Sequence, residues 1–169
     1  MSPRIVIETP RLILRHFTLK DADNLAVIYA DPITMKFLRR TRTYPETLDN
    51  LNLIFESYKQ YGFGLWAVIH KNDNKLIGRC GLIAQKIEGI SEVEIAYMIA
   101  RKYWRQGIGT EAASAIRDYG FQSLGYQRLI SLIDIDNIAS QKTALKTGMS
   151  YEREIIFDDK PILVYAIHS

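Results

Sequence analysis

The sequence predicts one α/β domain over residues 1–169, with a mostly antiparallel central sheet that contains one parallel pair of strands. The chain has 169 residues and 47% of them are hydrophobic, which is enough to bury a core. Segments with the two-residue rhythm of strands alternate with segments of helical spacing. One helical segment, residues 109–124, separates two apolar strands, and such a crossover makes those strands parallel.

The first half of the chain predicts one strand, two helices and a hairpin. After a short leader, residues 11–17 alternate large apolar and basic side chains, as a half-buried strand does. Thr18 or Asp21 can cap the first helix, which Asp31-Pro32 ends. We expect helices over residues 21–30 and from Tyr44-Pro45-Glu46 to Gly62, then hairpin strands over residues 65–70 and 76–87.

The second half predicts the crossover and a closing hairpin. A β-branched and aromatic strand over residues 93–99 precedes the crossover helix, and the near-continuous apolar run over residues 128–135 is typical of a strand covered on both faces. We expect a short helix over residues 139–147, then strands over residues 151–157 and 161–167 around the Asp158-Asp159 turn. The helices are expected to flank the sheet.

The stretch WRQGIGTEA, residues 104–112, opens the crossover helix with two glycines. It lacks the lysine of the nucleotide P-loop, because Gly109 is followed by Thr110-Glu111. Gly107, Gly109 and Ala112 do fit the dinucleotide pattern G-x-G-x-x-A, with Asp134 as the possible ribose partner.

A third template for this stretch is a loop of backbone N–H groups that binds a pyrophosphate at a helix N-terminus. Gly107 and Gly109 lack the Cβ atoms that would keep an anion away. Arg101, Lys102 and Arg105 supply long-range positive charge. The alternative is a tight turn without a ligand.

Three sequence blocks carry a resemblance to a known family. ETPRLILR at residues 8–15, EIAYMIARKYWRQGIGTEA at 94–112 and NIASQKTALKTGM at 137–149 are similar to blocks of the GNAT superfamily of acetyl-CoA-dependent N-acetyltransferases. Within it they resemble the branch of ribosomal-protein N-terminal (RimJ/RimL-type) acetyltransferases. Trp104 agrees with that branch, whereas Ala96, Lys142 and Met149 replace the glycine, arginine and phenylalanine that it commonly has.

The resemblance implies acetyl-CoA between the strands at 93–99 and 128–135, with its pyrophosphate on the loop. A main-chain N–H near Met98 to Ala100 would hold the thioester oxygen. The implied cofactor-binding residues are Met98, Ile99, Ala100, Arg105, Gln106, Gly107, Ile108, Gly109, Thr110, Asn137, Ser140 and Lys146.

The same resemblance implies three catalytic residues. Glu94 is the expected base for the acceptor amine, with Glu92 as the other possibility; either could instead be a solvated or paired charge. Ser140 would protonate the leaving thiolate, and Asn137 would position the pantetheine or a water. Alternatively, Asn137 ends a turn and Ser140 starts a helix, and Tyr97 or Tyr151 donates the proton.

Composition limits the partners. A net charge of +3 without a concentrated basic stripe argues against nucleic acid, and no apolar run is long enough for a membrane span, so we expect a cytoplasmic protein. The single cysteine, Cys80, is interpreted as a core residue, and the three scattered histidines lack metal-ligand spacing. We expect a monomer or homodimer that needs no metal.

The acceptor is expected to be a protein N-terminus or a small amine. The basic run Arg39 to Arg42 could attract an acidic acceptor or be a solvated loop. Two other functions remain open at this level, a non-catalytic acyl-CoA sensor and a nicotinamide-dependent oxidoreductase.

Overall fold

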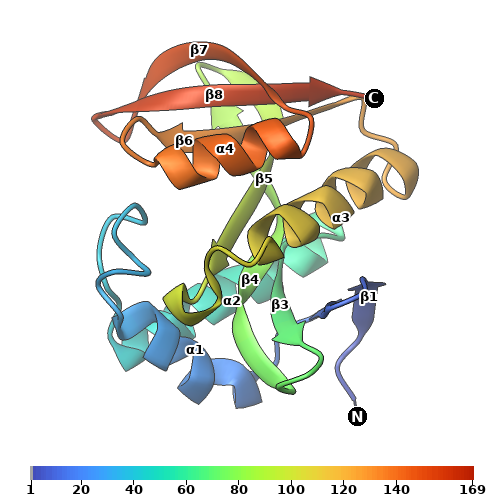
Figure 1. Ribbon diagram of the computed structural model, residues 1–169, viewed down its shortest axis with the longest axis vertical. Helices are drawn as coiled ribbons and strands as arrows, with labels where there is room; N and C mark the ends of the chain where they lie inside the picture. The colour runs from blue at the N-terminus through green and yellow to red at the C-terminus, as the bar shows by residue number, and fades with distance from the viewer. Residues whose placement is uncertain (1) are drawn as a thin grey trace.

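Eight strands form one mixed sheet in the computed structural model, which describes residues 2–169 (Figure 1). The sheet order is β1-β2-β3-β4-β5-β6-β8-β7, and only the β5–β6 neighbours are parallel. The mostly antiparallel sheet with one parallel pair is therefore confirmed. The strands are β1 (Ile5–Glu8), β2 (Leu12–Arg15), β3 (Leu65–His70), β4 (Lys75–Ile87), β5 (Ile90–Ile99), β6 (Arg128–Asp134), β7 (Ser150–Phe157) and β8 (Lys160–His168).

Helices cover both faces of this sheet. One core lies between α1, α2 and the sheet, and a second lies between α3 and the opposite face (Figure 1). A third, smaller cluster lies among β4, β6, β7 and β8. A capping box at Thr43 starts α2, and Gly62, with φ 75°, ends it in the left-handed conformation. The helices are α1 (Ala22–Ala30), α2 (Tyr44–Tyr61), α3 (Ile108–Gln122) and α4 (Ile138–Lys146), with short 3-10 turns at Leu19–Asp21 and Arg101–Tyr103.

The sequence prediction missed β1. Its four residues, IVIE, do not alternate between apolar and polar side chains, so the expected leader contains a strand that no periodicity indicates. This strand forms because the edge of β2 offers unpaired main-chain groups, and Glu8 pairs with Ile13 there. β5 also begins at Ile90, earlier than expected, because Glu88 and Gly89 alone make the turn, both with positive φ.

The parallel pair of strands separates soon after it meets. β4 and β5 pair over ten residues, whereas β5 and β6 share one paired position, Glu94 opposite Ile130. Immediately beyond it, the buried Ser131 hydroxyl donates to the Ile95 carbonyl at 2.8 Å and replaces a main-chain bond. The rest of β5 therefore faces an opening between the two halves of the sheet.

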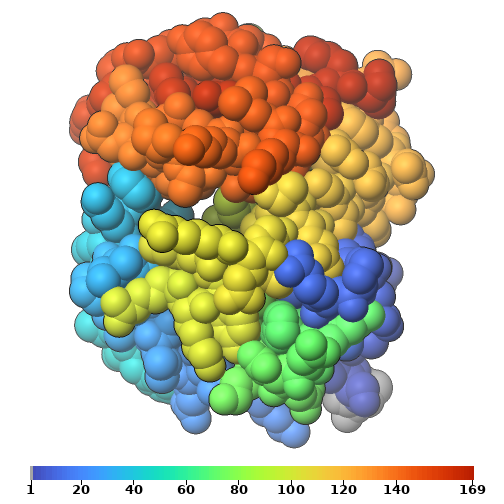
Figure 2. All heavy atoms as spheres, in the orientation of Figure 1, coloured from blue at the N-terminus to red at the C-terminus, as the bar shows by residue number. Residues whose placement is uncertain are grey.

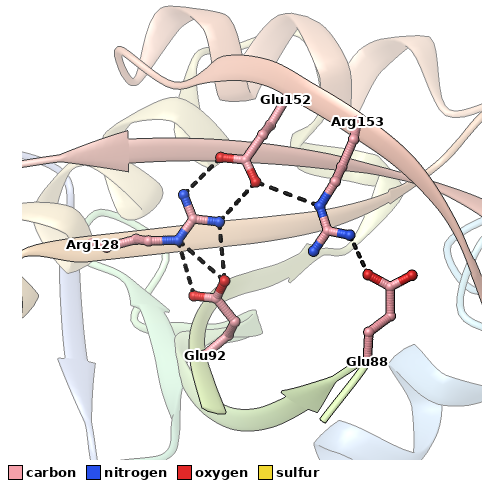
Figure 3. A network of polar contacts seen from close by, with 5 residues as sticks. All are labelled: Glu88, Glu92, Arg128, Glu152 and Arg153. Carbon is pink, nitrogen blue, oxygen red and sulfur yellow. Dashed lines mark hydrogen bonds and ion pairs between the residues drawn. The ribbon is translucent and has the colours of Figure 1, made fainter. Parts of the chain in front are cut away.

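A network of ion pairs closes the other end of this opening (Figure 3). Arg128, the first residue of β6, donates to Glu92 of β5 at 3.0–3.1 Å and to Glu152 of β7 at 2.7 and 2.9 Å. Arg153 of β7 pairs with Glu88 in the β4–β5 turn. The network thus holds three strands together on the side where β5 and β6 still meet.

We predict that Arg128→Met lowers the free energy of unfolding by about 2 kcal/mol, because it leaves the mostly buried Glu92 carboxylate without its partner. The matched control is Arg153→Met, whose partner Glu88 is 58% exposed and which should cost less than about 1 kcal/mol. Urea unfolding of both variants measures the difference. Equal losses would show that Arg128 has no special structural role.

Candidate active site

The loop before α3 forms a cradle of backbone N–H groups. Arg105 and Gly107 have positive φ, 61° and 74°, and the first bond of the helix runs from the Glu111 N–H to the Gly107 carbonyl. Within the described chain, none of the N–H groups of residues 105–110 donates a hydrogen bond. A Cβ at Gly109 would meet no protein atom within 4 Å. The loop therefore offers successive free donors at a helix N-terminus, as anion sites do.

Arg11, which directly precedes β2, holds this loop. Its guanidinium donates to the Gln106 carbonyl and to Glu111 of α3, both at 2.6 Å. The same carboxylate accepts from the Arg11 N–H at 2.9 Å and from the Thr9 hydroxyl at 2.6 Å. The sequence block around Arg11 was recognised only by resemblance, and its contact with the loop was not predicted, because no local pattern reveals a partner about a hundred residues away.

Main-chain directions alternate along β5 and decide which groups face the opening. The Ile95 and Ile99 carbonyls point to the β6 side, where Ser131 and the Trp104 indole N–H (2.6 Å) donate to them. The main-chain N–H and C=O groups of Tyr97 must point to the same side, since these groups alternate between successive residues of a strand. Of Met98 to Ala100, the residues expected to contact the cofactor, only Ile99 directs its main-chain groups to the opening. The Ala100 N–H donates to Ile77 of β4 at 2.7 Å, and by the same alternation Met98 faces β4.

Glu94 is buried where β5 and β6 separate. Its carboxylate accepts from Gln85 at 2.7 Å and from the Leu132 N–H, which the parted strands leave free. Burial raises the pKa of Glu94 to about 7, and these hydrogen bonds with the more distant Arg79 only partly offset that effect. Glu92, the other candidate base, is engaged by Arg128.

Asn137 and Ser140 lie at the start of α4, on the β6 side of the opening. Asn137 caps the helix: its Oδ1 accepts from the Ser140 N–H at 3.2 Å. The Tyr97 hydroxyl donates to the Ser140 main-chain carbonyl at 3.1 Å, so one expected proton donor lies against the backbone of the other. Tyr151 is exposed on β7 and contacts the Tyr165 ring edge-on. Lys146 is exposed in the last turn of α4.

The surface is hollowed above β5 (Figure 2). The hollow lies between the yellow segment that leads into α3, the orange α4 and the light-blue segment between α1 and α2. The cradle, the free edge of β5 and the start of α4 are thus the walls of one depression.

The residues that the alternative chemistries would use are already engaged or buried. Asp134, the possible ribose partner, accepts from the Asp136 N–H at 2.9 Å within its own turn. Cys80 is fully buried, and burial raises the pKa of its thiol. Among residues 2–169, no cluster of His, Cys, Asp and Glu could hold a metal ion, and no helix has the length and apolar character of a membrane span.

Relatives of known sequence support the family. The chain is 34% identical over 166 residues to the uncharacterised protein YkkB of Bacillus subtilis (strain 168), covering 98% of this chain and 96% of the relative. It is 30% identical over 151 residues to the uncharacterised N-acetyltransferase YoaA of the same organism, covering 87% and 84%.

Solved structures agree with the fold. A GNAT-family acetyltransferase from Bacillus anthracis matches with a TM-score of 0.79 and 27% identity, covering 96% of this chain and 97% of that one. RimL, a ribosomal L7/L12 α-N-protein acetyltransferase in complex with coenzyme A, has the same fold, with a TM-score of 0.80 and 15% identity over 98% of both chains. Residues 11–150 match the family model of the acetyltransferase (GNAT) domain. The chain therefore belongs to the GNAT family of acetyl-CoA-dependent acetyltransferases.

Proposed function

We propose that this protein transfers the acetyl group of acetyl-CoA to a primary amine, with Glu94 as the base that takes a proton from the amine. The observation that carries the proposal is the buried Glu94 carboxyl at the point where β5 and β6 separate. Its pKa of about 7 suits a base that must accept a proton near neutral pH and release it afterwards.

The loop at residues 105–110 would hold the pyrophosphate of the coenzyme. Its unpaired N–H groups and the open space beside Gly109 fit a phosphate group, and the exposed Arg105 adds charge. Acetyl-CoA supplies the reactive thioester. On β5, the main-chain N–H groups of Ile99 and Tyr97 are the donors on the side of the thioester oxygen.

The leaving thiolate needs a proton, and the start of α4 offers two donors for it. The Tyr97 hydroxyl bonds the Ser140 main-chain carbonyl there, and Asn137 leaves its Nδ2 donor available while its oxygen caps the helix. We assign proton return to this pair and orientation of the pantetheine to Asn137.

The acceptor amine must lose its proton before it attacks. An α-amine has an ordinary pKa near 8 and a lysine side chain near 10.4, so a base with a pKa of about 7 favours the α-amine by roughly 3 kcal/mol. We therefore propose a protein N-terminus as the acceptor, with low-pKa small amines as the second class. The likeness of the fold to RimL, a protein that acts on an α-amine, supports the same choice.

We predict that Gly109→Asp weakens binding of coenzyme A at least tenfold and leaves folding intact. The carboxylate would face the pyrophosphate, although an acidic residue in the first turn of a helix favours the helix itself. Gly109→Asn is the matched control of equal size without charge. Calorimetric titration of both variants measures the effect, and equal affinities would contradict an anion site at this loop.

Glu94→Gln is predicted to lower kcat by about a hundredfold or more without changing the affinity for coenzyme A. In the wild type kcat/KM should rise with pH up to about 7, where the carboxyl loses its proton, and this limb should vanish in the variant. Glu92→Gln, two residues away on the same strand, should keep the limb. A sensor without catalysis would instead bind acetyl-CoA and release no thiol with any amine.

The raised pKa of Glu94 also predicts a pH-dependent stability. The folded state holds the proton up to about pH 7 and the unfolded state only up to about pH 4.5, so the wild type loses stability as pH rises between these values. Relative to Glu94→Gln, the loss should reach about 3 kcal/mol at pH 8. Urea unfolding of both proteins at pH 4 and pH 8 measures it. A constant difference would mean that the Glu94 pKa is not raised.

A further inference from the structure

Three arginines of the basic segment at residues 39–42 have different surroundings. Arg39 pairs with Asp158, and Arg40 donates to Glu46 at 2.5 Å. Arg42 instead turns inward and stacks on the Tyr29 ring, with its guanidinium carbon 5.0 Å from the ring centroid. The segment is therefore more than a solvated basic loop, since one of its charges is directed into the molecule.

A second arginine meets Arg42 on the same ring. Arg79 of β4 lies 5.3 Å from the centroid of Tyr29, which is fully buried. Within residues 2–169 neither guanidinium forms an ion pair with a carboxylate, and Arg79 donates a long hydrogen bond of 3.5 Å to the Asn50 amide oxygen. Burial, and then repulsion from Arg79, lowers the pKa of Arg42. Glu46, whose charge acts on Arg42, is itself engaged by Arg40, and Glu94 acts on Arg79 only at longer range. Two partly buried like charges that form no direct ion pair are arranged to receive an anion.

Arg42 borders a hollow, and Arg79 lies on the same face of the sheet as Glu94. Arg42 and Asn50 line a depression of about 290 Å³ over α2, in which Glu46 is engaged by Arg40 and Asp49 lies exposed. Arg79 pairs with Met98, which shares its face of β5 with Glu94, and Arg79 acts electrostatically on Glu94.

The strand register gives the scale of the separation. Arg79 stands opposite Met98, and Glu94 lies four residues before Met98 on β5. At about 3.3 Å per residue, the Cα atoms of Met98 and Glu94 are about 13 Å apart, which sets a separation on the order of 10 Å between an anion at the pair and a nitrogen at Glu94. The carboxylate of a free α-amino acid is too close to its own amine for this span. An acidic side chain at the second or third residue of an extended peptide reaches it.

We propose that Arg42 and Arg79 bind an anionic group of the acceptor, and that the acceptor is a peptide N-terminus with an acidic side chain at its second or third residue. This inference rests on the proposed acetyl transfer at Glu94. The anionic group is a carboxylate or a phosphate, since a guanidinium pair recognises both.

The first test measures binding apart from catalysis. N-acetylated tetrapeptides with glutamate, glutamine or phosphoserine at the third position are titrated into the full-length protein with coenzyme A present. We expect the acidic peptides to bind at least about tenfold more tightly than the glutamine peptide. Arg42→Gln and Arg79→Gln should each remove this preference, whereas Arg40→Gln, from the same segment, should keep it. Equal binding of all peptides, or a preference that survives both variants, overturns the inference.

The second test measures turnover with the free-amine forms of the same peptides and with free glutamate. Acetylation of the glutamate and glutamine peptides at equal kcat/KM would contradict the acidic-acceptor inference, while the transferase assignment would stand. Selective binding of acidic peptides without any acetylation would retain the arginine site and contradict the proposed function. Arg42→Gln should lower kcat/KM for the glutamate peptide about tenfold and leave the glutamine peptide unchanged.

Discussion

The single paired position between β5 and β6 is the constraint on which the rest of the site depends. A parallel pair that continued past Glu94 and Ile130 would consume the edge of β5 in main-chain bonds. Because the strands part, the Leu132 N–H is free to bond the Glu94 carboxylate, and the Ser131 hydroxyl satisfies the Ile95 carbonyl. The opening is thus built into the hydrogen-bond pattern of the sheet, and the Arg128 network fixes the end from which it widens.

The loop before α3 depends on the same kind of long-range support. Left-handed residues at Arg105 and Gly107 leave successive N–H groups unpaired, a conformation that costs free energy unless neighbouring contacts hold it. Arg11 supplies these contacts by joining the Gln106 carbonyl to Glu111 on the first turn of the helix. A segment near the N-terminus therefore stabilises the loop before α3, which lies about a hundred residues away along the chain.

The elements were predictable where their patterns are local, and the site was predictable only in part. Alternation and glycine turns gave β2 to β8 and the four helices, while β1 was missed because its pairing with β2 creates it. The glycine pattern located the cradle. Nothing in the sequence indicated that Leu132 bonds Glu94, that Arg11 holds the loop or that Arg42 turns inward, since each depends on residues brought together by the fold.

Alternation along β5 also explains how one strand could serve two substrates. The edge of residues 95, 97 and 99 presents main-chain groups to the opening, where the coenzyme is proposed to bind. The side chains of Glu94, Ala96 and Met98 share the face covered by α1 and α2, which also holds Arg79. An acetyl donor along the edge and an acceptor amine over the face would therefore meet at Glu94, because its carboxylate bonds to β6 while its side chain belongs to the helical face. This geometry agrees with the proposed direct transfer between two bound substrates.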